Sequence, residues 1–145
     1  MIDTNIKGLL YVSRIVIPKM IERNSGHIIN IGSVAGHEVY IGGNVYCATK
    51  HAVKAISKGM LMDLNGTNIR VTSIDPGMTE TEFSLVRFKG DKDKADAVYK
   101  GMTPLTAENI ADIVVFAASR PQGVSIQTIV VTPTDQASAS IVHKR

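Results

Sequence analysis

Apolar residues in this chain fall into two patterns, one with helical spacing and one of short unbroken runs. Over residues 5–23 they recur at helical spacing, which predicts an amphipathic helix that Pro18 bends or interrupts. Residues 27–31 form a short β-branched run, typical of a strand that is covered on both faces. These two segments predict a helix that leads into a buried strand.

The same alternation continues toward the end of the sequence. It predicts two more helices and two more strands, at residues 44–64, 68–74, 106–118 and 125–132. Strands that alternate with helices imply parallel β-α-β units, so the fold class is α/β with a parallel sheet. No repeat and no low-complexity linker divides residues 1–145, which predicts a single domain.

Three other features complete this outline. Residues 32–43 form a glycine-rich loop, and the polar segment 81–99 is expected to hold one or two short mobile helices. The predicted helix at 44–64 has apolar or small residues on more than one face. It packs either with one face on the sheet and another on a partner subunit, or with all faces buried.

Composition excludes several classes of function. The 145 residues are 44% hydrophobic and 20% charged, which suits one globular domain with one core. The net charge of +3 is scattered, and no basic run is interleaved with aromatic residues, so nucleic-acid binding is not expected. The longest apolar runs are too short to span a membrane. A single cysteine, Cys47, excludes an internal disulfide, and no signal-peptide pattern opens the sequence, so a cytoplasmic location is expected.

Ser33, Tyr46 and Lys50 are the residues with the most distinctive chemistry. Ser33 ends an apolar strand, and Tyr46 and Lys50 are four residues apart in a predicted helix, which places them on one face. A phenol with an ordinary pKa of about 10 exchanges protons poorly at neutral pH. A neighbouring ammonium favours the phenolate, so we expect Lys50 to lower the pKa of Tyr46 and to make it a usable acid and base.

Each of these features also has an ordinary structural explanation. With four tyrosines in the chain, one Tyr-xxx-Lys pair arises by chance about one time in four. Ser33 can be a turn residue, Asn5 a helix cap, and Pro76-Gly77 simply a turn. Only their occurrence together, in order, favours a catalytic interpretation.

Four segments together resemble the short-chain dehydrogenase/reductase family. They are Asp3-Thr4-Asn5 before a helix, Ile31-Gly32-Ser33 at a strand end, Tyr46-xxx-Lys50 in the next helix, and Pro76-Gly77 with Thr81 after the following strand. More narrowly, residues 81–87 and 133–138 resemble the NADP-dependent 3-hydroxy acid (serine/allo-threonine) dehydrogenase branch. The resemblance implies the C-terminal half of a doubly wound parallel sheet of the Rossmann type, with three strands and flanking helices.

The resemblance also implies roles for individual residues. Tyr46 would exchange a proton with the substrate oxygen, Ser33 would hold that oxygen, Lys50 would contact the nicotinamide ribose, and Asn5 would hold a water of a proton relay. The cofactor would be NADP or NAD. The residues expected to bind it are Tyr46, Lys50, Pro76, Gly77, Met78, Thr79 and Thr81. The partners implied are a small-molecule substrate and further copies of the chain, as in the family's tetramers. No metal is expected, because the four histidines show no metal-ligand spacing.

One part of the family pattern has no match in these residues. Members open with a strand, a glycine-rich turn and a helix that hold the dinucleotide pyrophosphate, and residues 1–145 contain no such unit. Two interpretations therefore stay open. The chain is the catalytic portion of a dehydrogenase, or it is a truncated remnant that only oligomerises or is unstable. Arg87 has two interpretations as well, as an anchor for a substrate carboxylate or as a surface residue.

Overall fold

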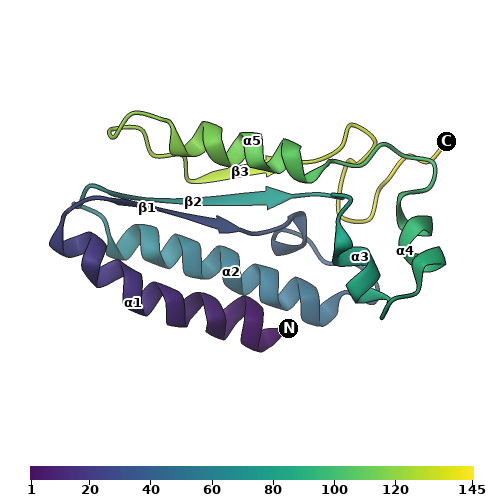
Figure 1. The fold of residues 1–145 in the computed structure, drawn as a ribbon, viewed down its shortest axis with the longest axis horizontal. Coiled ribbons are helices and arrows are strands. Elements are labelled where there is room, and N and C mark those ends of the chain that lie inside the picture. Colours follow the sequence, from purple (N-terminus) through teal and green to yellow (C-terminus); the bar gives the residue numbers. More distant parts are fainter.

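A computed structural model describes residues 1–145, and it shows a three-stranded parallel sheet between two layers of helices (Figure 1). The strands are β1 (Gly26–Ile31), β2 (Ile69–Pro76) and β3 (Thr128–Val131), arranged in that order. This confirms the predicted α/β class and its parallel sheet. The third strand is shorter than the predicted 125–132, because the residues before Thr128 contact β2 only through single bonds, such as the one from the Ser73 amide to the Gln127 carbonyl at 2.9 Å.

The strands pair in regular register along the sheet. Gly26 of β1 lies opposite Ile69 of β2, and the pairing continues to Ile31 opposite Ile74. The pairing of β2 with β3 extends to Pro76 opposite Val131. The carboxyl ends of β1 and β2 are thus level with each other, which is where open α/β sheets bind ligands.

Two helices cover one face of the sheet and a third covers the other (Figure 1). The pair consists of α1 (Leu9–Glu22) and α2 (Asn44–Asp63), and the third is α5 (Ala107–Ala118), which begins after a capping box formed by Thr106 and Asn109. Between the helix pair and the sheet lies a core of five buried residues: Met20, Met60, Leu64, Ile69 and Val71. Burial of this apolar surface holds the helices on the sheet.

The first helix differs from its prediction in two ways. It begins earlier, in a π-helical stretch at Asp3–Gly8, and Pro18 lies inside α1 without interrupting it. Proline fixes a backbone angle close to the helical one and removes a single N–H donor. The packing of Val16, Ile17 and Met20 against the core compensates for that loss.

The polar segment after β2 contains two short helices, α3 (Glu82–Arg87) and α4 (Lys92–Tyr99). Both lie with the C-terminal tail beyond the carboxyl ends of the strands (Figure 1). They therefore form a wall over the edge of the sheet where a ligand would bind. Their mobility stays a prediction.

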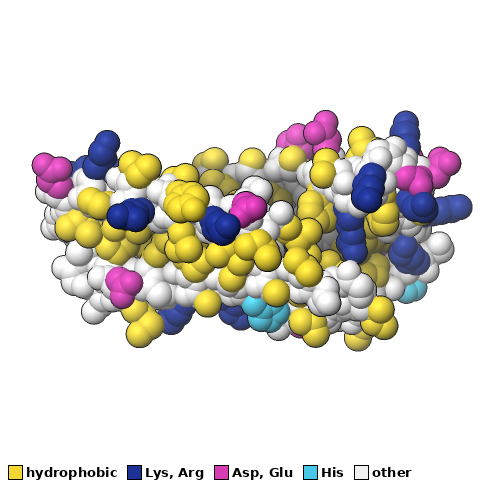
Figure 2. All heavy atoms as spheres, turned by 90° about the horizontal axis from the view of Figure 1, so that it is seen from below, with side chains coloured by type: hydrophobic (Ala, Val, Ile, Leu, Met, Phe, Trp, Pro, Cys, Tyr) yellow, Lys and Arg dark blue, Asp and Glu magenta, His cyan; other side chains and the backbone are white.

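The outer faces of α1 and α2 are exposed in this single chain. Tyr11 and Ile15 on α1 are 64% and 65% exposed, and Val45 and Met62 on α2 are also exposed. Figure 2, which views the molecule from the side of these helices, shows hydrophobic side chains gathered in bands along its length. The interpretation of residues 44–64 as a fully buried helix is therefore wrong, because one face of α2 is open. A partner subunit on that face stays a prediction.

None of the helices combines the length and the apolar character that a membrane crossing requires.

Candidate active site

A cleft of about 750 Å³ opens at the carboxyl ends of the strands. All nine of the site residues predicted from the sequence line it: Asn5, Ser33, Tyr46, Lys50, Pro76, Gly77, Met78, Thr79 and Thr81. They come from five different segments, which the sheet edge and the start of α2 bring together. The structure therefore places the candidate residues around one space, although their individual roles stay predictions.

Ser33 is held rigidly at the end of β1. Its hydroxyl accepts a hydrogen bond from the Ala35 amide at 3.1 Å and so caps a single 3-10 turn at Val34–Gly36. The same hydroxyl donates a weak bond to the Pro76 carbonyl at 3.4 Å. Ser33 is 8% exposed, so its oxygen has one fixed position at the floor of the cleft.

Tyr46 and Lys50 lie one turn apart on α2. The Lys50 ammonium is 5.9 Å from the centroid of the Tyr46 ring and donates a hydrogen bond to the Ile31 carbonyl at 3.0 Å. The Tyr46 ring packs on Phe83 of α3, with centroids 5.4 Å apart. The shared helix face predicted for the pair is therefore present, and α3 covers the tyrosine from the other side.

The expected effect of Lys50 on the pKa of Tyr46 is wrong in this structure. Burial raises the pKa of Tyr46, the Ser33 hydroxyl lowers it by less, and Lys50 is not among the causes. Burial also lowers the pKa of Lys50, and the charge of Asp75 partly opposes this. The reason is tertiary packing: Phe83 helps to desolvate the phenol, and the ammonium is turned toward the strand rather than toward the phenol oxygen.

Asn5 lies in the π-helical stretch that precedes α1. Its amide nitrogen donates to the Thr49 hydroxyl at 3.1 Å, and Thr49 in turn donates to the Tyr46 carbonyl at 2.8 Å. Asn5 therefore contacts α2 between the two candidate catalytic residues. Short π-helical segments are frequent at functional sites because they redirect one side chain. A water held by Asn5 stays a prediction.

The turn after β2 forms another wall of the cleft. Gly77 donates its amide to the Val131 carbonyl at 2.7 Å, and Met78 donates its amide to the Gln136 side-chain oxygen at 2.8 Å. A Cβ atom on Gly77 would lie 2.2 Å from that oxygen, so a larger residue here would displace the Gln136 side chain from the Met78 amide. Thr81 caps α3 by accepting from the Phe83 amide, which leaves its own O–H group free to donate.

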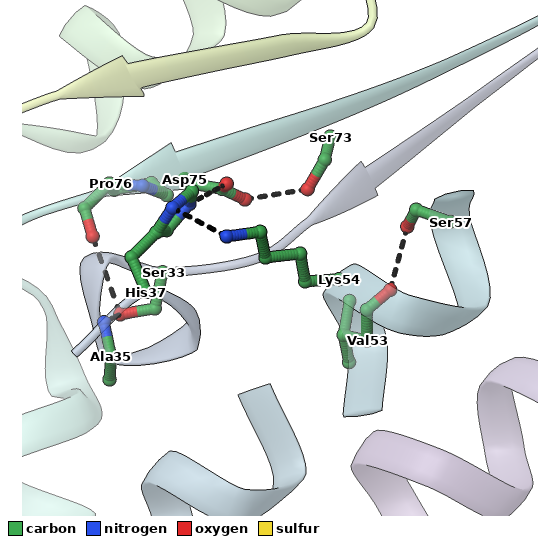
Figure 3. A network of polar contacts seen from close by, with 9 residues as sticks. All are labelled: Ser33, Ala35, His37, Val53, Lys54, Ser57, Ser73, Asp75 and Pro76. Atoms are coloured by element: carbon green, nitrogen blue, oxygen red, sulfur yellow. Dashed lines mark hydrogen bonds and ion pairs between the residues drawn. The ribbon is translucent and has the colours of Figure 1, made fainter. Parts of the chain in front are cut away.

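Asp75 is a buried carboxylate directly behind the site (Figure 3). It is 1% exposed, accepts a hydrogen bond from the Ser73 hydroxyl at 2.5 Å, and pairs with His37. The other ring nitrogen of His37 lies 2.9 Å from the Lys54 ammonium. When Lys54 donates to that nitrogen, the other ring nitrogen of His37 carries the proton and donates it to Asp75. The buried carboxylate of Asp75 then accepts hydrogen bonds from both His37 and Ser73.

Asp75 also explains the glycine at the strand end. A Cβ atom on Gly32 would lie 2.0 Å from an Asp75 carboxylate oxygen, so the Ile31-Gly32-Ser33 segment approaches β2 more closely than any other residue type allows. This close approach positions Ser33. Neither Asp75 nor Gln136 was singled out from the sequence, because each acts through a partner far away in the chain.

The fold and this cleft define the class of protein. Parallel strands with helices on both faces, and Ser33, Tyr46 and Lys50 around a cleft at the strand ends, are the arrangement implied by the sequence resemblance. The sequence profile of the family described as "short chain dehydrogenase" matches residues 1–91. The chain therefore belongs to the short-chain dehydrogenase family.

Individual relatives agree with this assignment. The chain is 45% identical over 145 residues to a protein of Schizosaccharomyces pombe and 50% identical over 147 residues to one of Escherichia coli. Both are named NADP-dependent 3-hydroxy acid dehydrogenase. Each match covers 100% of this chain but only 56% and 59% of the relative. The chain thus spans less than two thirds of the length of these relatives.

Solved structures give the same result. A closed form of serine dehydrogenase complexed with NADP+ superposes with a TM-score of 0.94 and 50% sequence identity, covering 100% of this chain and 59% of that one. A serine dehydrogenase structure from Escherichia coli superposes with a TM-score of 0.78 and 42% identity, covering 94% of this chain and 53% of that one. These matches confirm the Rossmann-type fold and the predicted branch of the family.

Proposed function

We propose that residues 1–145 are the catalytic portion of an NADP(H)-dependent dehydrogenase that interconverts short 3-hydroxy acids and 3-oxo acids. The observation that carries this proposal is the convergence of Ser33, Tyr46 and Lys50 on one cleft at the carboxyl ends of the strands. The names of the relatives supply the cofactor and the substrate class. NAD in place of NADP is the alternative for the cofactor.

The residues present suit one end of the cofactor. Lys50, Thr81 and the turn at 76–78 all line the cleft, and their ammonium, hydroxyl and backbone groups match the hydrogen-bonding groups of a nicotinamide riboside. The glycine-rich loop at residues 32–43 lies between a strand and a helix, but it carries Ser33 and lacks a Gly-x-x-Gly spacing, so it offers no seat for the pyrophosphate. We therefore propose that a separate dinucleotide-binding half supplies that seat.

The chemistry assigned to the chain is the handling of one proton. When bound, NADPH supplies the hydride that reduces a substrate carbonyl. Ser33 holds the carbonyl oxygen and donates a hydrogen bond to it as negative charge develops. Tyr46 transfers its phenolic proton to that oxygen, and in the reverse reaction its phenolate removes the proton of the hydroxyl group.

Lys50 and Asn5 complete this assignment. We propose that the Lys50 ammonium, whose own charge Asp75 supports, holds the nicotinamide ribose beside Tyr46. Asn5 is proposed to hold a water that returns a proton from solvent. Its amide oxygen makes no hydrogen bond to the rest of the chain, so it is free to accept one from water.

Assembly into a homo-oligomer is part of the proposal. The exposed apolar faces of α1 and α2 are the surfaces that we expect to meet another copy of the chain. A tetramer is what the family resemblance implies. A cytoplasmic location rests only on the single reduced cysteine, Cys47, which is buried.

The second candidate is a remnant without activity. One observation favours it: β1 is an edge strand in these residues, and Ile31 on it is 47% exposed. An unpaired apolar edge favours aggregation or pairing with another chain. A test of activity therefore has to distinguish an inactive set of catalytic residues from the lack of a dinucleotide-binding half.

The test compares two polypeptides. One is the 145-residue chain, and the other, called here the joined enzyme, carries the dinucleotide-binding half of the Escherichia coli relative ahead of Met1. We expect the joined enzyme to reduce 3-oxobutanoate with NADPH, and the short chain to do so at less than about 1% of that rate, because hydride transfer requires a held nicotinamide. The measurement is the loss of NADPH absorbance, repeated with NADH.

A joined enzyme that is folded but reduces no 3-oxo acid with either cofactor would refute the proposed function. A short chain as active as the joined enzyme would refute the proposed division between the two halves.

A further inference from the structure

The charges that line the cleft are all positive. Lys50 and Arg87 are its two cationic side chains, and no aspartate or glutamate lines it. Lys50 already donates to the Ile31 carbonyl. Arg87 takes part in none of the four ion pairs of the structure. The cleft therefore contains one guanidinium without an anionic partner, and its net charge attracts an anion.

Aromatic rings hold this guanidinium at the cleft wall. Arg87 is the last residue of α3, and its guanidinium carbon lies 5.7 Å from the ring centroids of both Tyr40 and Phe88. Tyr40 lines the cleft as well and comes from the loop before α2. A guanidinium that faces aromatic rings keeps N–H groups along its edge for a planar, two-oxygen partner.

The charge of Arg87 also reaches the candidate catalytic tyrosine. Burial has the largest effect on the pKa of Tyr46 and raises it, while Arg87 is among the groups that lower it. Tyr46 on α2 and Arg87 on α3 therefore both face the same cleft. A ligand bound to Arg87 lies in the cleft that also contains Ser33.

Capping of the C-terminus of α3 does not explain the position of the Arg87 side chain. Cations near a helix C-terminus can bond its last carbonyl oxygens, as Arg120 does with the Phe116 carbonyl at the end of α5. Arg87 makes no such bond to α3, and its guanidinium approaches Tyr40 of a separate segment instead. Helix α3 has only six residues, so its dipole stabilises a cation at the C-terminus only weakly.

We infer that Arg87 is the residue that binds the carboxylate of the ligand, and that this site selects short aliphatic carboxylates over neutral compounds of the same shape. A guanidinium binds a carboxylate through two parallel hydrogen bonds, which fixes orientation as well as position. The apolar part of the ligand would contact Val98, Ile110 and Val142. The identity of the reacting group rests on the proposed function, but the anion site rests on the position of Arg87 in the cleft and on its lack of an anionic partner.

The test measures binding to the 145-residue chain by NMR titration and needs no turnover. The probes are 3-hydroxybutanoate, its neutral counterpart butane-1,3-diol, and inorganic phosphate. We expect the wild-type chain to bind 3-hydroxybutanoate at least about tenfold more tightly than the diol, as one charged bidentate contact implies. Arg87→Gln should remove this preference, and Arg87→Lys should restore only part of it.

Lys89→Gln is the matched control. It removes one positive charge two residues away, but Lys89 does not line the cleft, so the preference should remain. Loss of the preference in this variant to the same degree would mean that net charge alone attracts the anion, and would overturn the inference. Unchanged thermal unfolding of Arg87→Gln would establish that its loss of binding is local.

Three other outcomes would also overturn the inference: no preference for the carboxylate in the wild-type chain, full preference in Arg87→Gln, or tighter binding of phosphate than of 3-hydroxybutanoate. The last would assign Arg87 to a phosphate group. If the joined enzyme reduces no 3-oxo acid but the carboxylate preference holds and depends on Arg87, the proposed function fails while the anion site stands.

Discussion

Replacing Tyr46 with phenylalanine is expected to lower kcat of the joined enzyme by about 10²- to 10⁴-fold. The substitution removes one oxygen and keeps the ring, so the contact with Phe83 remains and the free energy of unfolding should change little. Without the phenol, no other proton donor is expected at the substrate oxygen except Ser33. The measurement is the steady-state rate of NADPH oxidation with 3-oxobutanoate.

Tyr11→Phe is the control for this result. Tyr11 is exposed on α1 and does not line the cleft, so its variant should retain the wild-type rate. If Tyr46→Phe also retained the wild-type rate, the proton would have to come from another group and the assignment of Tyr46 would be wrong.

Replacing Lys50 with methionine is the second large effect that we expect. Methionine matches the length of the lysine stem but has no charge, and kcat should fall by about 10²-fold or more. The reason is the position of the cofactor: the Lys50 ammonium lies 5.9 Å from the centroid of the Tyr46 ring, where we propose that it holds the nicotinamide ribose beside the phenol. A nicotinamide that is not held in place transfers its hydride more slowly.

The loss should include weaker binding of the cofactor. Without the ammonium the KM for NADPH should rise by about tenfold, while the pH profile should not move, because Lys50 is not among the groups that shift the pKa of Tyr46. Lys58→Met, on the same helix but outside the cleft, is the matched control and should leave both kcat and KM unchanged. A Lys50→Met enzyme with the wild-type kcat and KM would contradict the role given to the ammonium.

Much of the fold could be predicted from the sequence, because its elements have strong local signals. The apolar runs at 27–31 and 68–74 correspond to β1 and β2 within two residues at each end, and the helix predicted at 106–118 corresponds to α5. The interruption at Pro18 was wrong, since a helix held by a core tolerates one missing donor. The helical spacing of the apolar residues predicted the extent of α1 better than the position of Pro18 did.

The membership of the site could also be predicted, but not its electrostatics. Ser33, Tyr46 and Lys50 were recognised from order and spacing, and the strand ends bring them together. The predicted lowering of the Tyr46 pKa was wrong, because burial raises this pKa. Part of that burial comes from Phe83, which belongs to a polar segment far along the chain and packs on the Tyr46 ring. Asp75, His37 and Gln136 were missed for the same reason: their roles come from pairings across the fold.

The central claim is that Ser33 and Tyr46 hold the same substrate oxygen beside a bound nicotinamide. The most direct measurement is a crystal structure of the joined enzyme with NADP and 3-hydroxybutanoate. We expect the hydroxyl oxygen of the ligand to lie about 2.6–3.2 Å from both the Ser33 Oγ and the Tyr46 Oη. A ligand bound outside the cleft, or one whose hydroxyl contacts neither residue, would contradict the claim.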